Sequence, residues 1–467
     1  MDTKQIPDTS LSIANPGRKH GREIFPQEAG NKPLRYNRFQ PTVVNTIPIP
    51  APKKAGKQFA RLFLMLTLLL QLSVSLFSVC FQSLAPEEPQ ILTWKYKVGS
   101  PMAASPVIAD GCIYVGAMNG TFYAIGAEDS SLLWQFKTYG PIRSTACIDT
   151  THVFILSGDG VLYCLDKKSG KMVWTFKTFT GYIGDRRYDF ADYYSSAPVL
   201  HNNVLYFGCS DGRIYALNST TGQYLWSYQT GDIVHTTPAL SGEKLFAGSF
   251  DGYLYALNAS TGALLWKFKS TGHRYFPRGE VTGNPVVLGE SVFVGTRDFN
   301  FYAIDVNGGY CRWLKQFPKG WALPVTSDGT TIYLGTSDDR QLLAIDPKTG
   351  EVRWTMNAGF NIFGGCALDG TTGYLGTLIG RVICFDTGTG TIRWSYYVEG
   401  YRENHLKYFK PDDSYRDDIG VIIKSNEDIL KLYNDVGAVF STPALWKNRM
   451  IVTSTDGNIY CLTPPKK

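Results

Sequence analysis

The chain has 467 residues, and its 44% hydrophobic and 14% aromatic content excludes a largely disordered protein. This length predicts two or three domains, or a single repeat architecture. The net charge of +6 arises within residues 1–61, which hold eleven Lys and Arg against four Asp and Glu, so the rest is almost neutral and we expect no nucleic-acid binding.

The N-terminal 90 residues predict a tail, a membrane span and a linker. Residues 1–58 are basic, Pro-rich near their end and without amphipathic period, which predicts a disordered cytoplasmic tail. Residues 62–81 are twenty residues without a charge, about 30 Å of helix, so we expect a transmembrane signal-anchor helix over 59–82 and a linker over 83–90. Basic residues precede the span, which places the remainder outside the cytoplasm, in the periplasm or at the cell surface.

Two other fates of this span stay open. Residues 83–85 read Ser-Leu-Ala, which resembles the cleavage site of a signal peptide, although Pro86 follows and the preceding tail is long. Lipidation at Cys80 is disfavoured because Val79, rather than a small residue, precedes it. The retained single span is the interpretation that we carry forward.

Beyond the linker, tryptophans reveal an internal repeat. Eight of them follow one another at spacings of 40 to 52 residues and are expected to dock neighbouring units: Trp94, Trp134, Trp174, Trp226, Trp266, Trp313, Trp354 and Trp394. Residues 210–218 and 250–258 share an Asp-Gly-x-x-Tyr-Ala-Leu-Asn pattern, and each is followed by Thr-Gly and a tryptophan. An Asp-Gly pair tolerates the positive φ of a tight hairpin. Each unit therefore reads as four short antiparallel strands, A to D, as in a propeller blade.

Counting the units predicts a closed ring. Seven complete blades begin near residues 105, 144, 196, 237, 284, 323 and 365. An eighth begins at residue 441 and lacks its tryptophan strand, whereas residues 92–96 form a tryptophan strand without a blade. We expect an all-β, eight-bladed propeller of four-stranded antiparallel blades over 91–467. Its N-terminal strand completes the last blade and removes an exposed sheet edge.

These units resemble the quinoprotein-type, or PQQ-like, repeat. The pattern Tyr-Ala-Leu-Asp-x-x-Thr-Gly-x-x-x-Trp is matched closely at 215–226 and 255–266 and more loosely at 163–174, 343–354 and 383–394. The resemblance implies one of two roles. Dehydrogenases of this type hold pyrroloquinoline quinone and calcium in the central funnel. Non-catalytic propellers, such as the lipoprotein of the outer-membrane β-barrel assembly machinery, bind proteins, and the chain is closest to these in character.

The sequence shows little sign of quinone chemistry. The adjacent cysteine pair of many alcohol-oxidising relatives is missing. Recurrent acids fall in B–C turns, where turn chemistry explains them, with a calcium site as the alternative: Asp159, Asp211, Asp251, Asp298, Asp338 and Asp456. Only His235 lies near the expected axis, and we interpret it as structural. Cysteines occupy alanine positions of the repeat, which favours free thiols. We expect no catalytic, metal or cofactor-binding residue, with pyrroloquinoline quinone and calcium as the alternative.

Three long D–A crossovers, 178–194, 270–283 and 397–440, project from one face of the expected ring. They are rich in Tyr and Arg, the residues that dominate interface hot spots. The candidate binding residues are Tyr182, Arg186, Arg187, Tyr188, Tyr193, Arg274, Tyr275, Arg278, Tyr401 and Arg402. Alternatively, these loops only pack on each other over the funnel. Residues 425–432 predict a short helix with Ser425 or Asn426 as N-cap.

These features predict a membrane-anchored, extracytoplasmic propeller that acts as a non-catalytic scaffold for a protein partner or an envelope ligand. Two alternatives remain. One is an oxidoreductase that depends on pyrroloquinoline quinone and calcium. The other is a sensor coupled through its basic cytoplasmic tail.

Overall fold

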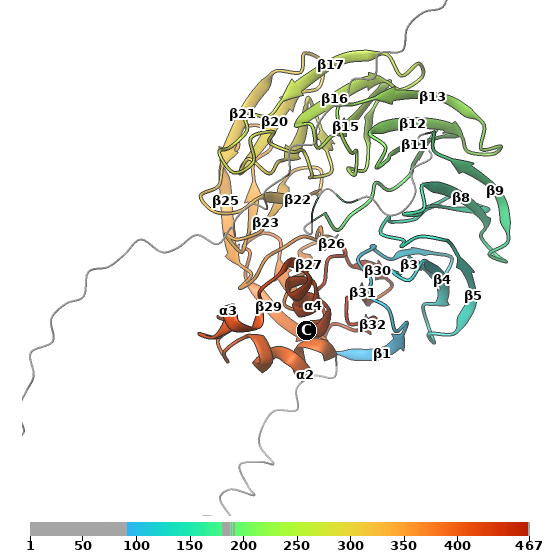
Figure 1. Cartoon of the computed structure of the whole chain (residues 1–467). Coiled ribbons are helices and arrows are strands. Elements are labelled where there is room, and N and C mark those ends of the chain that lie inside the picture. The colour runs from blue at the N-terminus through green and yellow to red at the C-terminus, as the bar shows by residue number, and fades with distance from the viewer. Residues whose placement is uncertain (1–90, 180–186, 188, 190–191, 466–467) are drawn as a thin grey trace, which may run out of the picture. The chain divides into compact units, whose positions relative to one another are not determined.

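The computed structural model describes residues 91–179, 187, 189 and 192–465 (Figure 1). The predicted tail, membrane span and linker, residues 1–90, lie outside this part of the chain, as do 180–186, 188, 190–191 and 466–467. Among the described residues, no helix is both long and apolar enough to cross a bilayer. The anchor and its topology therefore stay predictions. The described residues belong to one compact unit.

This unit contains eight four-stranded antiparallel sheets, which confirms the propeller predicted from the repeat. The sheets follow one another around a common centre (Figure 1). The A strands are β2 (Val107–Ala109), β6 (Cys147–Ile148), β10 (Val199–His201), β14 (Ala239–Ser241), β18 (Val286–Leu288), β22 (Ala322–Ser327), β26 (Ala367–Asp369) and β30 (Ala444–Trp446). The B strands are β3 (Cys112–Gly116), β7 (His152–Leu156), β11 (Val204–Gly208), β15 (Lys244–Gly248), β19 (Ser291–Gly295), β23 (Ile332–Thr336), β27 (Thr372–Gly376) and β31 (Arg449–Thr453).

The C and D strands complete each sheet, and the D strands lie on the outside of the ring (Figure 1). The C strands are β4 (Thr121–Gly126), β8 (Val161–Asp166), β12 (Arg213–Asn218), β16 (Tyr253–Asn258), β20 (Asn300–Asp305), β24 (Gln341–Ile345), β28 (Arg381–Asp386) and β32 (Asn458–Leu462). The D strands are β5 (Leu132–Lys137), β9 (Met172–Lys177), β13 (Tyr224–Gln229), β17 (Leu264–Lys269), β21 (Cys311–Gln316), β25 (Val352–Asn357), β29 (Ile392–Tyr397) and β1 (Leu92–Lys97).

The eighth sheet joins the two ends of the propeller. The N-terminal strand β1 pairs antiparallel with β32, and Trp94 stands opposite Cys461. Contacts between β30 and β2 then link this sheet to the first blade. Just before these two strands, the Thr442 amide donates a hydrogen bond of 2.9 Å to the Ser105 hydroxyl. The chain's N-terminal strand therefore serves as the D strand of its last blade.

Neighbouring blades dock through the repeated tryptophans. Seven of the eight donate the indole N–H to a backbone carbonyl of the next blade's C–D turn, as Trp226 does to Ala259 at 2.9 Å. The glycine of the same turn lies under the indole ring. A Cβ added to Gly262 would stand 2.6 Å from the Trp226 ring, which is closer than real contacts allow. The tryptophan and the Thr-Gly pair of the repeat are thus two halves of one inter-blade contact.

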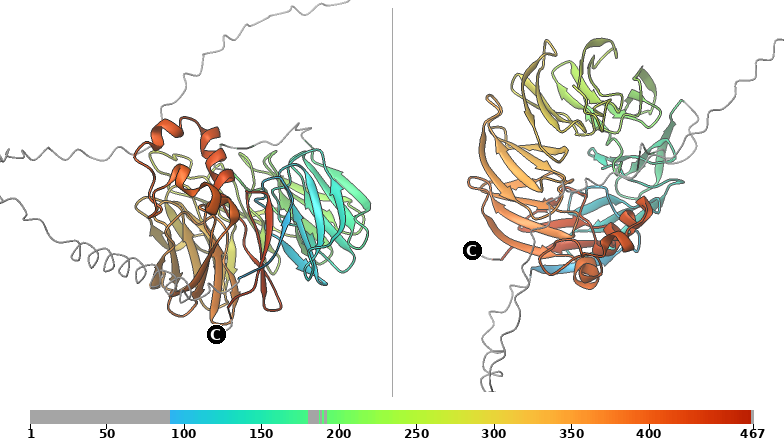
Figure 2. Two further views of the ribbon diagram at one scale, coloured as in Figure 1. Left: turned by 90° about the horizontal axis from the view of Figure 1, so that it is seen from below. Right: turned by 60° about the vertical axis from the view of Figure 1, so that its left-hand side comes forward.

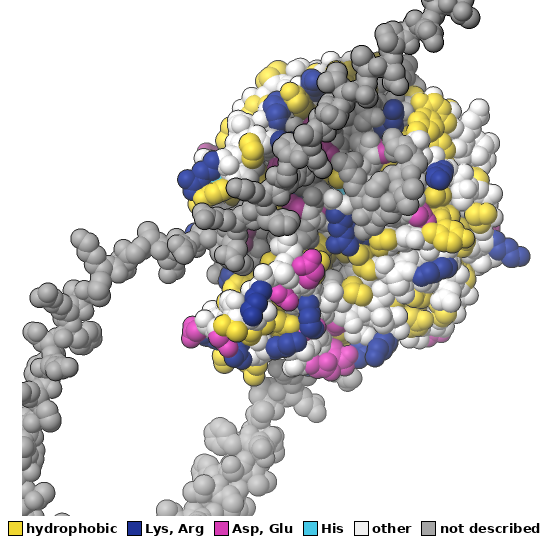
Figure 3. Space-filling model, viewed as in Figure 1, with side chains coloured by type: hydrophobic (Ala, Val, Ile, Leu, Met, Phe, Trp, Pro, Cys, Tyr) yellow, Lys and Arg dark blue, Asp and Glu magenta, His cyan; other side chains and the backbone are white. Residues whose placement is uncertain are grey.

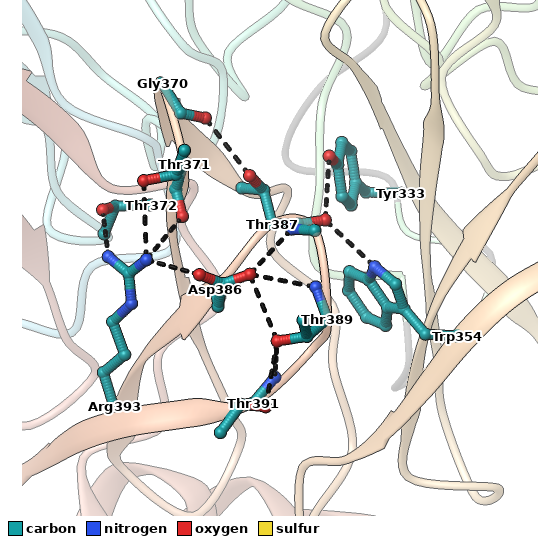
Figure 4. A network of polar contacts seen from close by, with 11 residues as sticks. Tyr333, Trp354, Gly370, Thr371, Thr372, Asp386, Thr387, Thr389, Thr391 and Arg393 are labelled. Carbon is teal, nitrogen blue, oxygen red and sulfur yellow. Dashed lines mark hydrogen bonds and ion pairs between the residues drawn. The ribbon is translucent and has the colours of Figure 1, made fainter.

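Figure 4 shows one of these junctions, at the C–D turn of the seventh blade. One carboxylate oxygen of Asp386 accepts the amide N–H of Thr389 at 3.0 Å, and the other lies 2.5 Å from Arg393. These contacts fix the conformation of the turn. The indole N–H of Trp354 donates to the carbonyl of Thr387 in this turn at 3.0 Å. The hydrogen bond from Arg393 lowers the pKa of Asp386. The Asp386–Arg393 ion pair therefore helps to position the Thr387 carbonyl, which accepts the hydrogen bond from the neighbouring blade.

Aspartates at the same position of the C–D turn in two other blades predict that the propeller loses stability in acid. The pKa of Asp305 is lowered to about 2, chiefly by the amide of Gly308, and that of Asp346 to about 2, chiefly by Arg353. The unfolded value is about 3.9, so both carboxylates stabilise the fold above about pH 4, and this contribution disappears as the pH falls through about 2. In thermal melts from pH 5 to pH 2, we expect the double substitution Asp305→Asn and Asp346→Asn to reduce the loss of stability. An unchanged pH dependence would contradict this assignment.

The recurrent aspartates of the B–C turns are satisfied locally in five blades. In the fourth, Asp251 accepts the amide of Tyr253 at 2.9 Å and the hydroxyl of Tyr255 at 2.6 Å. The same pair of contacts recurs at Asp159, Asp211, Asp298 and Asp456. Asp338 departs from this pattern, and the neighbouring Asp339 accepts the amides of Lys319 and Gly320 from the crossover before β22. Turn chemistry therefore accounts for five of these six acids.

The eight cysteines of the described residues are free thiols, as the repeat positions favoured. Cys164 and Cys384 stand where the repeat has alanine, and both pack between sheets. Burial raises the pKa of Cys164 to about 12. Such a thiol is protonated at neutral pH and serves as a small apolar side chain.

Candidate binding face and central cluster

All three predicted insertions leave the ends of D strands, namely β9, β17 and β29. The third insertion carries three helices: α2 (Glu399–Tyr408), α3 (Ile419–Ile422) and α4 (Asn426–Val436). Figure 2 shows these helices standing on one face of the ring. In antiparallel blades the D–A crossovers share this face with the B–C turns. We call it the D–A face.

Helix α4 begins where the sequence predicted a helix. The Ser425 hydroxyl accepts the amide N–H of Asp428 at 3.2 Å, and the Asp428 carboxylate accepts the amide of Ser425 at 3.0 Å. This reciprocal capping box satisfies two backbone donors that a helix start leaves unpaired. The helix ends at Gly437, which adopts a left-handed φ of 71°. The prediction of a helix over 425–432 is confirmed, and the helix continues to Val436 because Leu432 and Val436 pack into a buried cluster.

The first and third insertions pack together above the centre of the ring. The hydroxyl of Tyr194 donates to the carbonyl of Phe363 at 2.7 Å and to that of Phe440 at 3.0 Å. These two acceptors belong to the crossovers that lead into the seventh and eighth blades. Near Tyr194 and Phe440, the insertions therefore pack on each other, as the alternative interpretation predicted.

The ten predicted binding residues occupy different surroundings. Four are exposed: Arg274, Tyr275, Arg278 and Arg402. Two are partly buried: Arg187 and Tyr401. Tyr193 is buried, and three lie outside the described residues: Tyr182, Arg186 and Tyr188.

The prediction for Tyr193 needs correction, because its ring is not at the surface. Its centroid lies 4.1 Å from that of Phe440, and its edge meets Phe363. Burial raises the pKa of Tyr193 far above its usual value. The ring therefore stabilises the insertion through apolar contacts and offers no exposed anchor to a partner.

The second insertion keeps its aromatic and basic side chains outward. The guanidinium of Arg274 lies over the ring of Tyr275, 4.4 Å from its centroid, and Tyr275 is 49% exposed. Arg278 forms an ion pair of 2.6 Å with Asp232 from the preceding crossover while most of its side chain stays in solvent. This part of the D–A face therefore presents one aromatic ring and two guanidinium groups to solvent.

Two predicted residues of the third insertion differ in role. The hydroxyl of Tyr401 donates to Asp413 at 2.7 Å, and its ring stacks on Tyr397 at 4.2 Å, so Tyr401 fixes α2 to the blade. Desolvation raises the pKa of Tyr401. Arg402 donates to the carbonyl of Tyr397 at 3.0 Å and remains exposed.

Acidic and basic side chains alternate over the helices of the third insertion, at the lower left of Figure 3. Ion pairs join Lys407 to Asp435 at 2.6 Å and Lys410 to Asp417 at 2.6 Å. The Lys410–Asp417 pair is exposed, so it contributes at most about 1 kcal/mol to stability, whereas Asp435 is partly buried. Their effect on the face is a mixed charge pattern with no large field of one sign.

Beneath the insertions lies a central cluster of polar side chains: Asp189, Asp192, Ser210, His235, Arg297 and Trp321. Arg297 is 1% exposed and forms an ion pair of 2.5 Å with Asp189. Its guanidinium also lies 4.5 Å from the Trp321 ring and 5.2 Å from that of Phe250. A buried cation needs such partners, because desolvating it alone is costly.

His235 is the one member of this cluster that the sequence indicated. Its Nδ1 lies 2.8 Å from Oδ1 of Asp192, and its Nε2 lies 2.7 Å from the hydroxyl of Ser210. Arg143, also buried, holds the end of the first insertion by donating to the carbonyls of Asp192 at 2.7 Å and Tyr194 at 3.1 Å. Sequence reasoning missed Asp192, Ser210 and Arg297, because none stands in a recognisable motif.

The space around this cluster is small. One cavity, of about 20 Å³, lies between Asp192, His235, Arg297 and the aromatic rings of Trp321 and Phe363. A second, of about 10 Å³, adjoins Ser210 and His235. Each has room for about one water molecule. Among the described residues, no group of three or more His, Cys, Asp or Glu side chains could hold a metal ion.

A family model agrees with this architecture. The model described as outer membrane protein assembly factor BamB matches residues 88–148 and 140–356, more than half of the chain. The chain belongs to this family. No curated protein matches the chain by sequence.

Solved structures share the fold of this BamB family member. BamB from Moraxella catarrhalis is 17% identical, with a TM-score of 0.57, and the match covers 80% of this chain and 98% of that one. Quinohemoprotein alcohol dehydrogenase from Comamonas testosteroni is 14% identical, with a TM-score of 0.59, covering 80% and 77%. The computationally designed Ika8 protein is 15% identical, with a TM-score of 0.61, covering 80% and 100%. At these identities the likeness concerns the fold alone.

Proposed function

We propose that this chain is a membrane-tethered, extracytoplasmic scaffold that binds a protein or an envelope ligand through its D–A face. Exposed Arg274, Tyr275, Arg278 and Arg402 on insertions above a rigid ring carry the proposal. Tyr and Arg anchors commonly dominate binding energy, and function often lies on loops that a rigid scaffold positions. Residues 59–82 would hold the scaffold at the membrane, with the basic tail on the cytoplasmic side.

The family supports a role in binding proteins. The family's description, outer membrane protein assembly factor, refers to the assembly of other proteins. The D–A face suits such a role because its mixed charges and exposed rings resemble the polar rim and aromatic anchors of protein interfaces. We therefore favour a protein partner over an envelope ligand of another kind.

The role that we propose uses no quinone. A cofactor of that size needs a site of about 300 Å³ or more, and the cavities at the centre of the ring measure about 20 and 10 Å³. Beside these cavities, a buried cluster contains Tyr193, Phe363 and Phe440. The space available thus supports binding at the outer D–A face over a quinone oxidoreductase. Coupling through the cytoplasmic tail would be an addition to this role.

Substitution of the exposed anchors tests the proposal. In affinity capture from detergent-solubilised membranes, the full chain with Arg274→Ala, Tyr275→Ala and Arg278→Ala should lose its partner by about 30-fold or more, because such anchors often contribute about 2 kcal/mol each. The melting temperature should change little, since exposed substitutions usually cost within about 0.5 kcal/mol. In the same membranes, the full chain should resist extraction by alkaline carbonate.

The matched control is on the opposite face. Lys168→Ala and Lys348→Ala change two exposed cations in C–D turns and should leave capture intact. Loss of the partner in this control, with capture retained by the triple variant, would place the binding site on the other face. Recovery of a soluble chain beginning near Pro86 would show that the span is cleaved off and is not retained as an anchor.

A further inference from the structure

The outer side of the propeller carries exposed apolar side chains in blades one to four. The residue directly before the docking tryptophan is apolar there and 45% to 57% exposed: Leu133, Val173, Leu225 and Leu265. The residue before each of these is apolar and exposed as well. The strands that carry them, β5, β9, β13 and β17, follow one another along the outside of the ring (Figure 1). We call these four residues, each with the one before it, the apolar rim.

A β-bulge turns both side chains of each pair outward. In β5, Leu132 stands opposite Ile125. The next paired residue is Trp134, opposite Ala124, which leaves Leu133 without an opposite residue. The same irregularity recurs in β9, β13 and β17. Because the extra residue interrupts the alternation of the strand, two consecutive apolar side chains face solvent while the tryptophan still docks on the next blade.

Blades five to seven show that the fold does not require apolar side chains at this place. The residue directly before the tryptophan is Arg312, Arg353 or Arg393. Each of these arginines forms an ion pair with an aspartate where its C strand ends, at 2.5, 2.7 and 2.5 Å. Contiguous exposed apolar side chains mark a contact with another molecule or with a membrane. The apolar rim therefore indicates a contact that blades one to four make and the next three do not.

The N-terminal strand starts beside this rim. At the start of β1, the indole N–H of Trp94 donates to the carbonyl of Ala127 in the C–D turn of the first blade, at 3.3 Å. Leu133 follows that same turn in β5. The predicted membrane span ends at residue 82, and residues 83–91 reach at most about 30 Å when fully extended. A bilayer that holds the span is therefore within reach of the end of the blades that carries the rim.

Basic side chains lie farther along the same strands. Together, β1, β5, β9, β13 and β17 contain six lysines and no Asp or Glu. Exposed Lys137, Lys177 and Lys269 end their strands about 13 Å beyond the rim. The C–D turns of the third and fourth blades, 219–223 and 259–263, carry no charge, and those of the first two hold two acids and three lysines. Apolar groups at the acyl boundary with cations near the phosphates are typical of contact with an anionic bilayer.

We propose that the apolar rim lies in the interfacial layer of the bilayer that anchors the chain, so that blades one to four rest on the membrane. This inference deepens the tethered scaffold proposed above and rests on its membrane span. The rim adjoins the C–D turns, whereas the insertions rise from the opposite face. The same orientation therefore turns the D–A face away from the bilayer and toward a partner.

Photoactivatable lipids test this contact. The full chain is reconstituted into vesicles of phosphatidylethanolamine and phosphatidylglycerol that contain a lipid with a diazirine in its acyl chain, and adducts are located by peptide mass spectrometry. Peptides of β5, β9, β13 and β17 should carry about fivefold or more adduct than those of β21 and β25, because interfacial apolar side chains reach the acyl boundary. The triple variant Leu133→Gln, Leu225→Gln and Leu265→Gln should reduce rim adducts about tenfold, because it removes the apolar area that enters the bilayer.

The matched control uses exposed apolar residues outside the rim. Leu314→Gln in β21 and Val352→Gln in β25 make the same kind of change in D strands of other blades and should leave the rim adducts unchanged. All five positions are exposed, so the variants should fold. Enriched rim adducts that the triple variant loses and the control keeps would support the contact.

Other outcomes separate this inference from the proposed function. A chain that resists alkaline carbonate but shows no enrichment at the rim would overturn the contact and leave the anchor in place. Release of the chain by carbonate would contradict the anchor and overturn the inference that rests on it. A dimer in detergent that the triple variant abolishes, without enrichment of lipid adducts, would assign the rim to a second copy of the chain. Loss of partner capture in the D–A face variants bears only on the binding role.

Discussion

A chain that begins at residue 99 should aggregate or melt at a temperature lower by about 10 °C or more than a chain that begins at residue 88. The shorter chain lacks β1, whose five paired residues complete the eighth sheet against β32. It also loses Trp94, a partly buried ring that packs against a buried cluster containing Ile451 and Cys461. Truncation of a fully buried aromatic residue costs about 3–5 kcal/mol, so the partly buried Trp94 contributes less than this, and the exposed β32 edge favours association.

Thermal melts and light scattering at equal concentration would measure both effects. The single substitution Trp94→Ala separates the ring from the strand, because it keeps the backbone pairing and removes only the side chain. It should fall between the two chains. Equal melting of the shorter and longer chains would mean that the eighth blade does not need its N-terminal strand.

Gly262→Ala should destabilise the propeller by about 2–5 kcal/mol, although it adds only one methyl group. The added Cβ would stand 2.6 Å from the Trp226 ring, and the backbone there has a φ of +72°. A left-handed conformation costs an alanine about 1–2 kcal/mol, and overpacking adds about 1–3 kcal/mol. Chemical denaturation, followed by the loss of tryptophan fluorescence, would give the free energy of unfolding.

The same blade supplies the control. Gly242 also has a positive φ, of +56°, but nothing lies within 4 Å of a Cβ added there. Gly242→Ala should therefore cost only the backbone part, about 1–2 kcal/mol. If both substitutions cost the same, the glycine under the indole contributes its backbone conformation alone, and the ring contact is not what docks the blades.

The repeat determined most of the fold because its information is local. Each repeat of about 40 residues contains the sequence signals for its four strands and its turns, so eight copies specify eight sheets. The unpaired tryptophan strand at Trp94 and the unfinished unit at the C-terminus predicted a shared last blade. Ser425 likewise predicted the start of α4, since an N-cap is a local signal.

The central cluster depended on tertiary structure instead. Asp192, Ser210 and His235 are members of three separate segments, and no spacing between them is fixed by a strand or a turn. The one available signal was weak: the place after each B strand holds Ser210, Phe250 and Arg297 in successive blades, although the residues around it repeat. Variation at one position of a regular repeat indicates a side chain that faces something other than its own blade.

The sequence by itself determined the number of blades, the strand order and the face from which the insertions rise, because periodic contacts between neighbouring residues encode them. Only the tertiary structure decided which insertion residues are exposed. Arg274 and Tyr275 remain in solvent, whereas Tyr193 is buried against Phe440 from a segment about 250 residues away. Burial of that kind depends on which distant crossovers meet above the ring. A local pattern of Tyr and Arg does not predict which of these side chains are buried.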